Sequence, residues 1–193
     1  MKKRVGVLAL QGDFEAHEKA LVRAGADAVQ VRTAEELRNI DGLVIPGGES
    51  TTMLKLLNYM DLTEPLRQFA KAKPVFGTCA GAILLAKNVQ NPEQESFDAV
   101  DMTVERNAYG RQNDSRVVNL EPDAEFQQRA GAGNLEAVFI RAPIIRRTGP
   151  GVKVLAEYDG NPVLVEQGKH LIATFHPELT QDSRVHELFL SKI

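Results

Sequence analysis

The sequence predicts an α/β fold with three layers, built on an open, mostly parallel sheet with added antiparallel strands. Two observations lead to this prediction. Apolar runs of strand length alternate with helical patterns through the first half, which is typical of doubly wound folds. The runs are continuously apolar, as expected of parallel strands covered on both faces. The 193 residues suffice for a buried core, and we expect residues 1–193 to form a single domain.

The parallel part of the sheet is expected in the first half. Predicted strands span residues 5–10, 28–31, 42–45 and 74–76, and predicted helices span residues 14–24, 51–59, 63–70 and 80–86. The second half is expected to add antiparallel strands to the same sheet. Its predicted elements are strands at 101–106, 137–141, 152–158, 162–166 and 170–174, hairpin turns at 159–161 and 167–169, surface loops at 91–97 and 131–134, and a helix at 183–190.

Composition and charge narrow the class of protein. The net charge is −3, without a long block of like charge, so neither nucleic acid nor an anionic membrane is an expected partner. The apolar run after the basic N-terminal residues is too short for a signal peptide, and no run approaches the roughly 20 residues that span a bilayer. A single cysteine excludes an internal disulfide and a multi-cysteine metal site. We therefore expect a cytoplasmic protein.

The sharpest local signal surrounds Cys79. An apolar strand leads directly into an apolar helix, with Cys79 at the turn and Gly77 and Gly81 two residues to either side. This is the form of a nucleophile elbow with cysteine in place of serine. The helix N-terminus favours the reactive thiolate, and the backbone N–H of Ala80 is placed to stabilise an oxyanion. A buried structural cysteine is the alternative.

A thiol nucleophile needs a histidine that takes its proton and returns it to the leaving amine. His176 follows an apolar strand, so it should emerge at a strand end, where open α/β sheets bind ligands. Glu178 can hydrogen-bond the imidazole and fix its tautomer, although an ordinary loop would also explain the pair. Packed or solvated roles are expected for His17 and His186 in amphipathic helices. A structural role is expected for His170, which is the next candidate for the base.

The loop at residues 46–52 is the third element of the predicted site. A buried strand ends in Gly47 and Gly48, and Glu49 and hydroxyl residues suited to helix capping follow. The two glycines allow the backbone to approach a ligand closely. The spacing and the lysine of a phosphate-binding P-loop are absent, which favours an oxyanion or substrate loop. Three strand ends thus converge on one crevice, and this convergence predicts an enzyme.

Six motifs run in order over nearly the whole chain, at residues 6–12, 46–52, 77–81, 104–112, 139–143 and 175–179. Together they resemble the class I, triad-type glutamine amidotransferases, and more closely the glutaminase subunits of pyridoxal 5′-phosphate synthase. The elbow and His-Pro-Glu are shared by many amidotransferases. The runs Gly-Gly-Glu-Ser-Thr-Thr, Arg-Asn-x-x-Gly-Arg-Gln and Phe-Ile-Arg-Ala-Pro point to the synthase subunits.

The resemblance implies a flavodoxin-like fold and a triad of Cys79, His176 and Glu178. In such a site, cysteine attacks the side-chain carboxamide of L-glutamine and gives a γ-glutamyl thioester and ammonia, and hydrolysis then gives L-glutamate. The implied oxyanion hole consists of Gly48 and Ala80, and the implied glutamine contacts are Gly47, Gly48, Glu49, Arg106, Ile140 and Arg141. Independently of the family, the two arginines suit an amino-acid carboxylate, although most arginines are solvated surface residues.

The resemblance also implies a partner. Ammonia passes to a barrel-shaped pyridoxal 5′-phosphate synthase subunit, which forms a double ring with glutaminase subunits docked outside, and docking activates the glutaminase by reorienting the oxyanion loop. Pyridoxal phosphate is then the product of the complex, and no cofactor or metal is expected in this chain. One position departs from the family pattern. Arg116 stands where an aromatic residue is common, which puts only local packing or docking in doubt.

Three alternatives stay open from the sequence. Another amidotransferase subunit, such as the one serving imidazole glycerol phosphate synthesis, would use the same triad with a different acceptor enzyme. A cysteine peptidase or a DJ-1-like stress protein would share the scaffold without needing both the His-Pro-Glu order and the Gly-Gly loop. A non-enzymatic binding module would leave Cys79 buried or redox-sensing, without selective, glutamine-protectable labelling.

Overall fold

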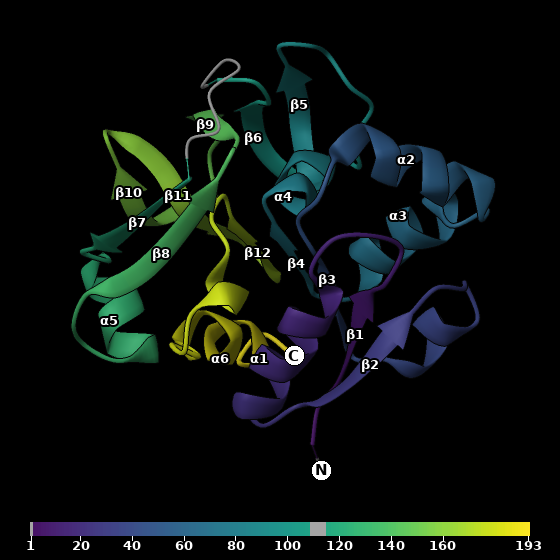
Figure 1. Cartoon of the computed structure of the whole chain (residues 1–193), viewed down its shortest axis with the longest axis horizontal. Coiled ribbons are helices and arrows are strands. Elements are labelled where there is room, and N and C mark those ends of the chain that lie inside the picture. Colours follow the sequence, from purple (N-terminus) through teal and green to yellow (C-terminus); the bar gives the residue numbers. More distant parts are fainter. Residues whose placement is uncertain (1, 109–114) are drawn as a thin grey trace.

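The computed structural model describes residues 2–108 and 115–193, and its centre is a seven-stranded sheet in the order β10-β11-β12-β4-β3-β1-β2 (Figure 1). The strands from β12 to β2 are mutually parallel, whereas β11 and β10 continue the sheet antiparallel. The mostly parallel sheet with added antiparallel strands is therefore confirmed. The strand bounds are β1 Arg4–Leu8, β2 Asp27–Val31, β3 Gly42–Ile45, β4 Val75–Thr78, β10 Lys153–Tyr158, β11 Asn161–Gln167 and β12 His170–Ala173.

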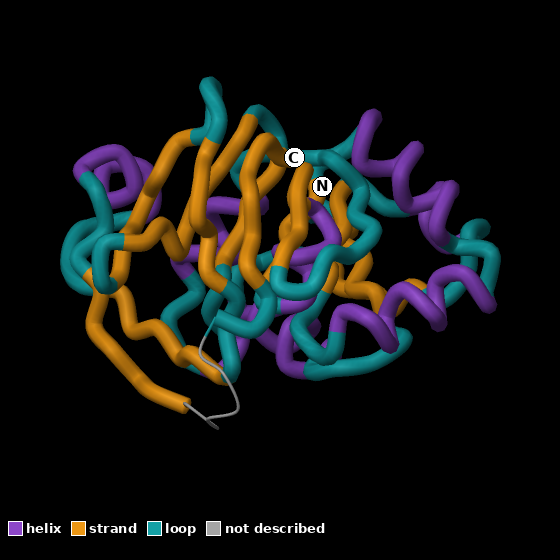
Figure 2. Tube along the Cα trace, turned by 90° about the horizontal axis from the view of Figure 1, so that it is seen from above, coloured by secondary structure: helices purple, strands orange, loops and turns teal. Residues whose placement is uncertain are grey.

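Helices cover both faces of the central sheet and complete the three layers (Figures 1 and 2). In β3, Leu43 and Ile45 belong to one hydrophobic core and Val44 belongs to the other. Because successive strand residues point to opposite faces, a strand covered on both sides must be continuously apolar. The first core holds α2 Ser50–Tyr59, α3 Thr63–Ala72 and α4 Ala80–Leu85, and the second holds α1 Phe14–Arg23, α5 Ala124–Ala130 and α6 Arg184–Leu190. Two short 3₁₀ helices are η1 Glu36–Asn39 and η2 Pro177–Leu179.

Two smaller sheets correct the prediction for the second half. β6 Val100–Glu105 lies between β5 Ala86–Gln90 and β9 Ile144–Thr148, and β7 Ser115–Leu120 pairs with β8 Leu135–Ile140. The expectation that the strands at 101–106 and 137–141 join the central sheet is wrong. Buried and more exposed residues alternate along β6 and β8, so each strand packs one face only. That pattern suits an outer sheet rather than a doubly covered one.

Both predicted hairpin turns are confirmed. Tyr158 pairs with Asn161 across the β10–β11 turn, where Asp159 and Gly160 have φ values of 50° and 73°. Two positive φ values in a two-residue loop match the right-handed twist of the strands, which explains the Asp-Gly sequence. Gln167 pairs with His170 across the β11–β12 turn.

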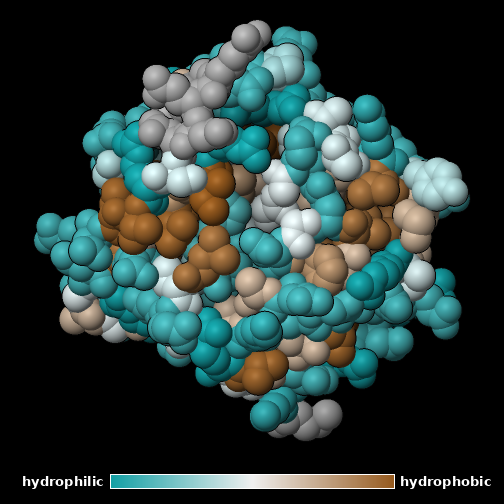
Figure 3. Space-filling model, viewed as in Figure 1, coloured by the Kyte–Doolittle hydropathy of each residue, from teal (hydrophilic) through white to brown (hydrophobic). Residues whose placement is uncertain are grey.

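The surface of the described residues mixes polar and apolar side chains. Figure 3 shows hydrophobic groups in separate patches among hydrophilic ones. The exposed large hydrophobic side chains come from different elements and are Val22, Tyr59, Met60, Val117 and Leu179. No helix among residues 2–108 and 115–193 combines the length and apolar character needed to cross a membrane.

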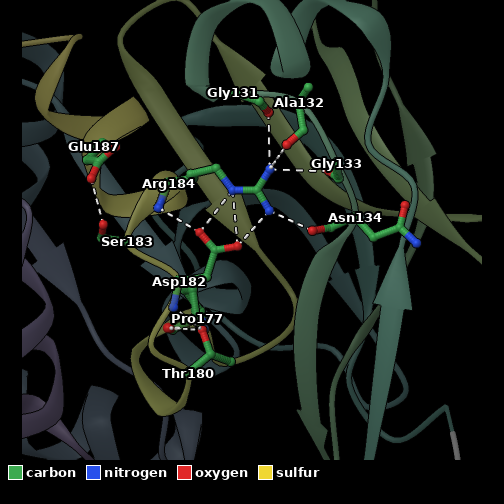
Figure 4. Close-up of polar contacts among 10 residues, drawn as sticks. All are labelled: Gly131, Ala132, Gly133, Asn134, Pro177, Thr180, Asp182, Ser183, Arg184 and Glu187. Carbon is green, nitrogen blue, oxygen red and sulfur yellow. Dashed lines mark hydrogen bonds and ion pairs between the residues drawn. The ribbon is translucent and has the colours of Figure 1, made fainter.

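Arg184 fastens the loop between α5 and β8 to the segment that follows η2 (Figure 4). Its guanidinium donates hydrogen bonds to the Asp182 carboxylate and to the main-chain oxygens of Gly131, Ala132, Gly133 and Asn134. Burial raises the pKa of Asp182, but the hydrogen bonds from Arg184 outweigh burial and lower it. The clamp thus joins the base of β8 to the segment that carries His176 and Glu178.

Replacing Arg184 with Met should lower the free energy of unfolding by about 2–3 kcal/mol, because Asp182 loses its charged partner and four carbonyls lose a donor. Urea denaturation measures the change. Arg147→Met is the matched control, since Arg147 is half-exposed and forms one ion pair with Asp101, and it should cost about 0.5 kcal/mol or less. Equal losses in the two variants would contradict the clamp.

Candidate active site

Cys79 occupies a sharp turn between β4 and α4, with φ 49° and ψ −104°. Its N–H donates to the Ala173 carbonyl of β12 at 3.0 Å. The flanking glycines are needed for space. A Cβ at Gly81 would lie 2.1 Å from the Ile45 carbonyl oxygen, and a Cβ at Gly77 would lie 2.7 Å from the Gly81 carbonyl. The segment therefore has the shape of a nucleophile elbow, with a positive φ that is strained for cysteine.

His176 and Glu178 form a buried pair at the end of β12. The His176 Nδ1–H donates to Glu178 Oε1 at 2.7 Å, and the His176 main-chain N–H donates to the Val138 carbonyl of β8 at 2.8 Å. The Glu178 side chain is fully buried. Because Nδ1 is engaged with the carboxylate, Nε2 is the nitrogen left for the sulfur of Cys79.

The electrostatics favour a protonated His176. Burial lowers the pKa of its imidazole, but hydrogen bonding and charge interactions with Cys79 and Glu178 outweigh burial and raise the pKa to about 10. An imidazolium beside a cysteine is the arrangement that stabilises a thiolate, the nucleophilic form of the side chain.

A cavity of about 430 Å³ opens beside Cys79 and His176. It brings together Cys79, His176 and all six residues expected to contact substrate, namely Gly47, Gly48, Glu49, Arg106, Ile140 and Arg141. Glu178 and Ala80 do not line the cavity, and both are buried. The other lining residues, none of which was expected to contact substrate, are Gly12, Asp13, Ser50, Ile83 and Asn107.

Three of these missed residues stand inside the recognised motifs. Gly12 ends the motif at 6–12, Ser50 belongs to the motif at 46–52, and Asn107 follows Arg106 in the motif at 104–112, so their motifs could have indicated them. Residues 109–112 of the last of these motifs lie outside the described residues.

The Gly-Gly loop approaches the histidine closely. A Cβ at Gly47 would lie 2.6 Å from His176 Cε1 and 3.3 Å from the Cys79 Cβ. Gly48 has a φ of 138°, and a Cβ there would lie 2.7 Å from Gln11 Nε2. The Gln11 amide donates to the Glu49 carbonyl at 2.8 Å. Glycine is therefore required at both positions, which brings the loop backbone up against the reacting groups.

The charged residues of the cavity differ in how many hydrogen bonds and ion pairs they already make within the protein. Glu49 caps α2 by accepting hydrogen bonds from Thr51 and Thr52, which outweigh burial and lower its pKa to about 2. Arg106 donates to Thr51 Oγ1 at 2.8 Å and lies 3.5 Å from Glu49 Oε1. Arg141 has a φ of 45° and makes no hydrogen bond or ion pair with another described residue. Arg141 is the cation that a carboxylate ligand can engage at least cost.

His170 lies far from this chemistry. It begins β12, whereas His176 follows the end of that strand, so the two residues lie toward opposite ends of β12. The Val75 N–H donates to His170 Nδ1 at 3.3 Å, and burial lowers the pKa of His170 to about 4. His170 therefore cannot replace His176 as the base.

The fold and the site define a class of protein, the glutamine amidotransferases. A solved structure described as "Crystal structure of glutamine amidotransferase" is 48% identical in sequence, covers 97% of both chains and superposes with a TM-score of 0.87. Residues 7–193 match the SNO glutamine amidotransferase family, and the chain belongs to this family. The resemblance drawn from the motifs is thereby confirmed.

Two curated relatives are similar over almost their whole length. The pyridoxal 5′-phosphate synthase subunit PdxT of Solibacter usitatus is 65% identical, covering 99% of this chain and 100% of the relative. The subunit of the same name from Koribacter versatilis is 58% identical, covering 98% of this chain and 95% of the relative.

Proposed function

We propose that this chain is the glutaminase subunit of a pyridoxal 5′-phosphate synthase and hydrolyses L-glutamine to L-glutamate and ammonia. The observation that carries the proposal is the imidazole of His176, which is held by Glu178 beside Cys79 in a cavity large enough for an amino acid. The relatives named as synthase subunits support the choice of pathway.

The reaction proceeds in two halves. The Cys79 thiolate attacks the side-chain carboxamide, and the resulting oxyanion is stabilised by the backbone N–H groups of Gly48 and Ala80. His176 gives its proton to the leaving nitrogen, so that ammonia departs and a γ-glutamyl thioester forms. His176 then takes a proton from water, which attacks the thioester and releases glutamate. Glu178 keeps the imidazole in the productive tautomer.

The residues that line the rest of the cavity bind the glutamine substrate. Arg141 takes the α-carboxylate of the substrate, because its guanidinium makes no hydrogen bond or ion pair with another described residue and can bind the carboxylate bidentately. Arg106 and Glu49 contact the substrate as a preformed pair, and Gly47 and Ile140 shape the pocket around it. This division predicts that Arg141 contributes to the KM for glutamine more than to kcat.

The partner is a synthase subunit that consumes the ammonia. We propose that it is barrel-shaped, forms a double ring, and carries this chain docked on the outside as a single domain. Docking activates the glutaminase by reorienting the loop at Gly47 and Gly48. We place the complex in the cytoplasm, where reducing conditions keep the single cysteine as a thiol.

Ammonia release from glutamine tests the proposal, measured for the chain alone and again with a pyridoxal 5′-phosphate synthase barrel subunit. Strong stimulation by the barrel is the expected result. High activity that the barrel does not change would preserve the triad but assign the chain to another acceptor enzyme. No activity in either mixture would contradict the proposed function.

Replacing Gly47 with Ala should lower glutaminase activity by roughly 10²-fold. The added Cβ would lie 2.6 Å from Cε1 of His176, so either the imidazole or the loop must move. The rate of ammonia release measures the effect. Gly160→Ala is the control, since an added Cβ at Gly160 meets no atom within 4 Å, although its φ of 73° makes alanine strained there. Comparable activity in the two variants would show that the close approach of Gly47 to His176 is unimportant.

A further inference from the structure

The second carboxylate oxygen of Glu178 is not explained by the triad. Oε1 accepts from His176, but no described group makes a well-aligned hydrogen bond to the buried Oε2. An ionised carboxylate oxygen inside a protein is costly without a donor. The ring nitrogen Nε2 of His17 lies 3.3 Å from this oxygen, and both side chains are fully buried.

His17 joins three elements behind the cavity. It lies on α1, its Nε2 is 3.1 Å from the hydroxyl oxygen of Thr78, and its Nδ1 is 3.1 Å from His186 Nε2 on α6. Thr78 directly precedes Cys79, so His17 contacts the strand of the nucleophile as well as the carboxylate of the triad. His17 does not line the cavity, so a direct role with substrate is excluded.

The hydrogen-bond pattern selects one pair of tautomers. If His17 donated from Nδ1, His186 would accept on Nε2 and carry its proton on Nδ1, which has no partner among the described residues. Glu178 Oε2 would then also lack a donor. If both histidines are protonated on Nε2, His186 donates to His17, and the proton on His17 lies within reach of Glu178 and Thr78. Only a lone pair on His186 is left unpaired, which costs less than a buried N–H.

Both histidines are held neutral by their surroundings. Burial lowers the pKa of His17 well below its usual value, and the nearby rings of His186 and His176 lower it further. Burial is also the main cause that lowers the pKa of His186, to about 3. The ring of Phe76 packs edge-on against both imidazoles. A neutral donor stabilises the Glu178 carboxylate without neutralising the charge that His176 needs beside it.

We propose that His17 is a positioning residue of the triad: its Nε2–H holds the second carboxylate oxygen of Glu178, and His186 fixes the tautomer of His17. The inference rests on the proposed function for its catalytic consequence, because Glu178 in turn orients the base His176.

Three variants of His17 separate hydrogen bonding from packing. His17→Leu removes both ring nitrogens at similar volume, His17→Gln places an amide donor near the Nε2 position, and His17→Asn places one near the Nδ1 position. The matched control is His170→Gln, since His170 is also a buried histidine but lies at the start of β12, at the end of that strand away from His176. Thermal unfolding confirms that each variant is folded.

Steady-state glutamine hydrolysis in the complex with the barrel subunit is the first readout. His17→Leu and His17→Asn should lose roughly tenfold in kcat, the expected worth of one hydrogen bond to a charged group, with KM unchanged. His17→Gln should recover most of the loss, and His170→Gln should keep the activity of the original chain. If His17→Leu fails to fold, the comparison of Gln with Asn decides. Equal kcat values for those two variants would overturn the proposal.

Alkylation of Cys79 by iodoacetamide as a function of pH, on the chain alone, is the second readout. A misplaced Glu178 holds the imidazolium less well, so the pH midpoint of alkylation should rise in His17→Leu and return in His17→Gln. An unchanged midpoint in His17→Leu would overturn the proposal. Because alkylation requires neither glutamine nor the barrel, it tests the positioning role even if the proposed glutaminase function fails.

Discussion

The Cys79→Ala variant should release no ammonia from glutamine and should keep its fold. The thiolate is the only nucleophile that the cavity offers next to His176 among the described residues. Alanine fits the elbow, because the substitution removes one atom from a side chain that is 7% exposed at the cavity wall. It therefore leaves little empty volume. The expected effect is the largest of any single substitution in the chain.

Ammonia release by the complex measures this effect, and thermal unfolding with binding to the barrel subunit provides the control for structure. Cys79→Ser is a useful companion, because it keeps the size of the side chain and replaces the sulfur with a weaker nucleophile at neutral pH. Both variants should dock normally. Turnover near that of the original chain in Cys79→Ala would refute the proposed mechanism.

His176→Asn should lower kcat by about 10²–10⁴-fold, the usual worth of general acid–base catalysis. Asparagine can place its amide N–H near the position of Nδ1 and keep the contact with Glu178, but it offers nothing at the position of Nε2. The variant thus removes the proton transfer with little loss of the local hydrogen bonding. The loss should fall on kcat rather than on KM.

The control for His176→Asn is His170→Asn, which alters a buried histidine at the opposite end of β12. It should reduce stability without a comparable effect on kcat. A near-native rate in His176→Asn would remove this residue from the mechanism and require a different base.

The middle of the central sheet was predictable because β1, β3 and β4 are buried along almost their whole length and are largely apolar. In β3, all four residues are buried, and the sequence Gly-Leu-Val-Ile shows this directly. β5 was missed because its sequence, Ala-Lys-Asn-Val-Gln, has three exposed polar residues and too few apolar ones to show a pattern. α5 was missed because it has only seven residues and buries a single one, Phe126. Such short elements are stabilised by tertiary packing.

The site residues were predictable where the chemistry is local in sequence. The elbow at Cys79 and the pair His176 and Glu178 each depend on neighbouring residues, and a motif shows them. The position of His17 depends instead on the packing of α1 against α6 and η2, which brings it to Glu178 across more than 150 positions. Its burial and its three partners, Glu178, Thr78 and His186, could not be deduced from helical spacing alone.

The most direct test of the account is covalent labelling of the chain with a glutamine-mimicking electrophile, followed by peptide mass spectrometry. We expect one modified peptide, with the adduct on Cys79. L-glutamine should protect this site from labelling. His176→Asn should label more slowly at neutral pH. Labelling that glutamine does not protect, or an adduct on any residue other than Cys79, would contradict the claim that this cysteine is the glutaminase nucleophile.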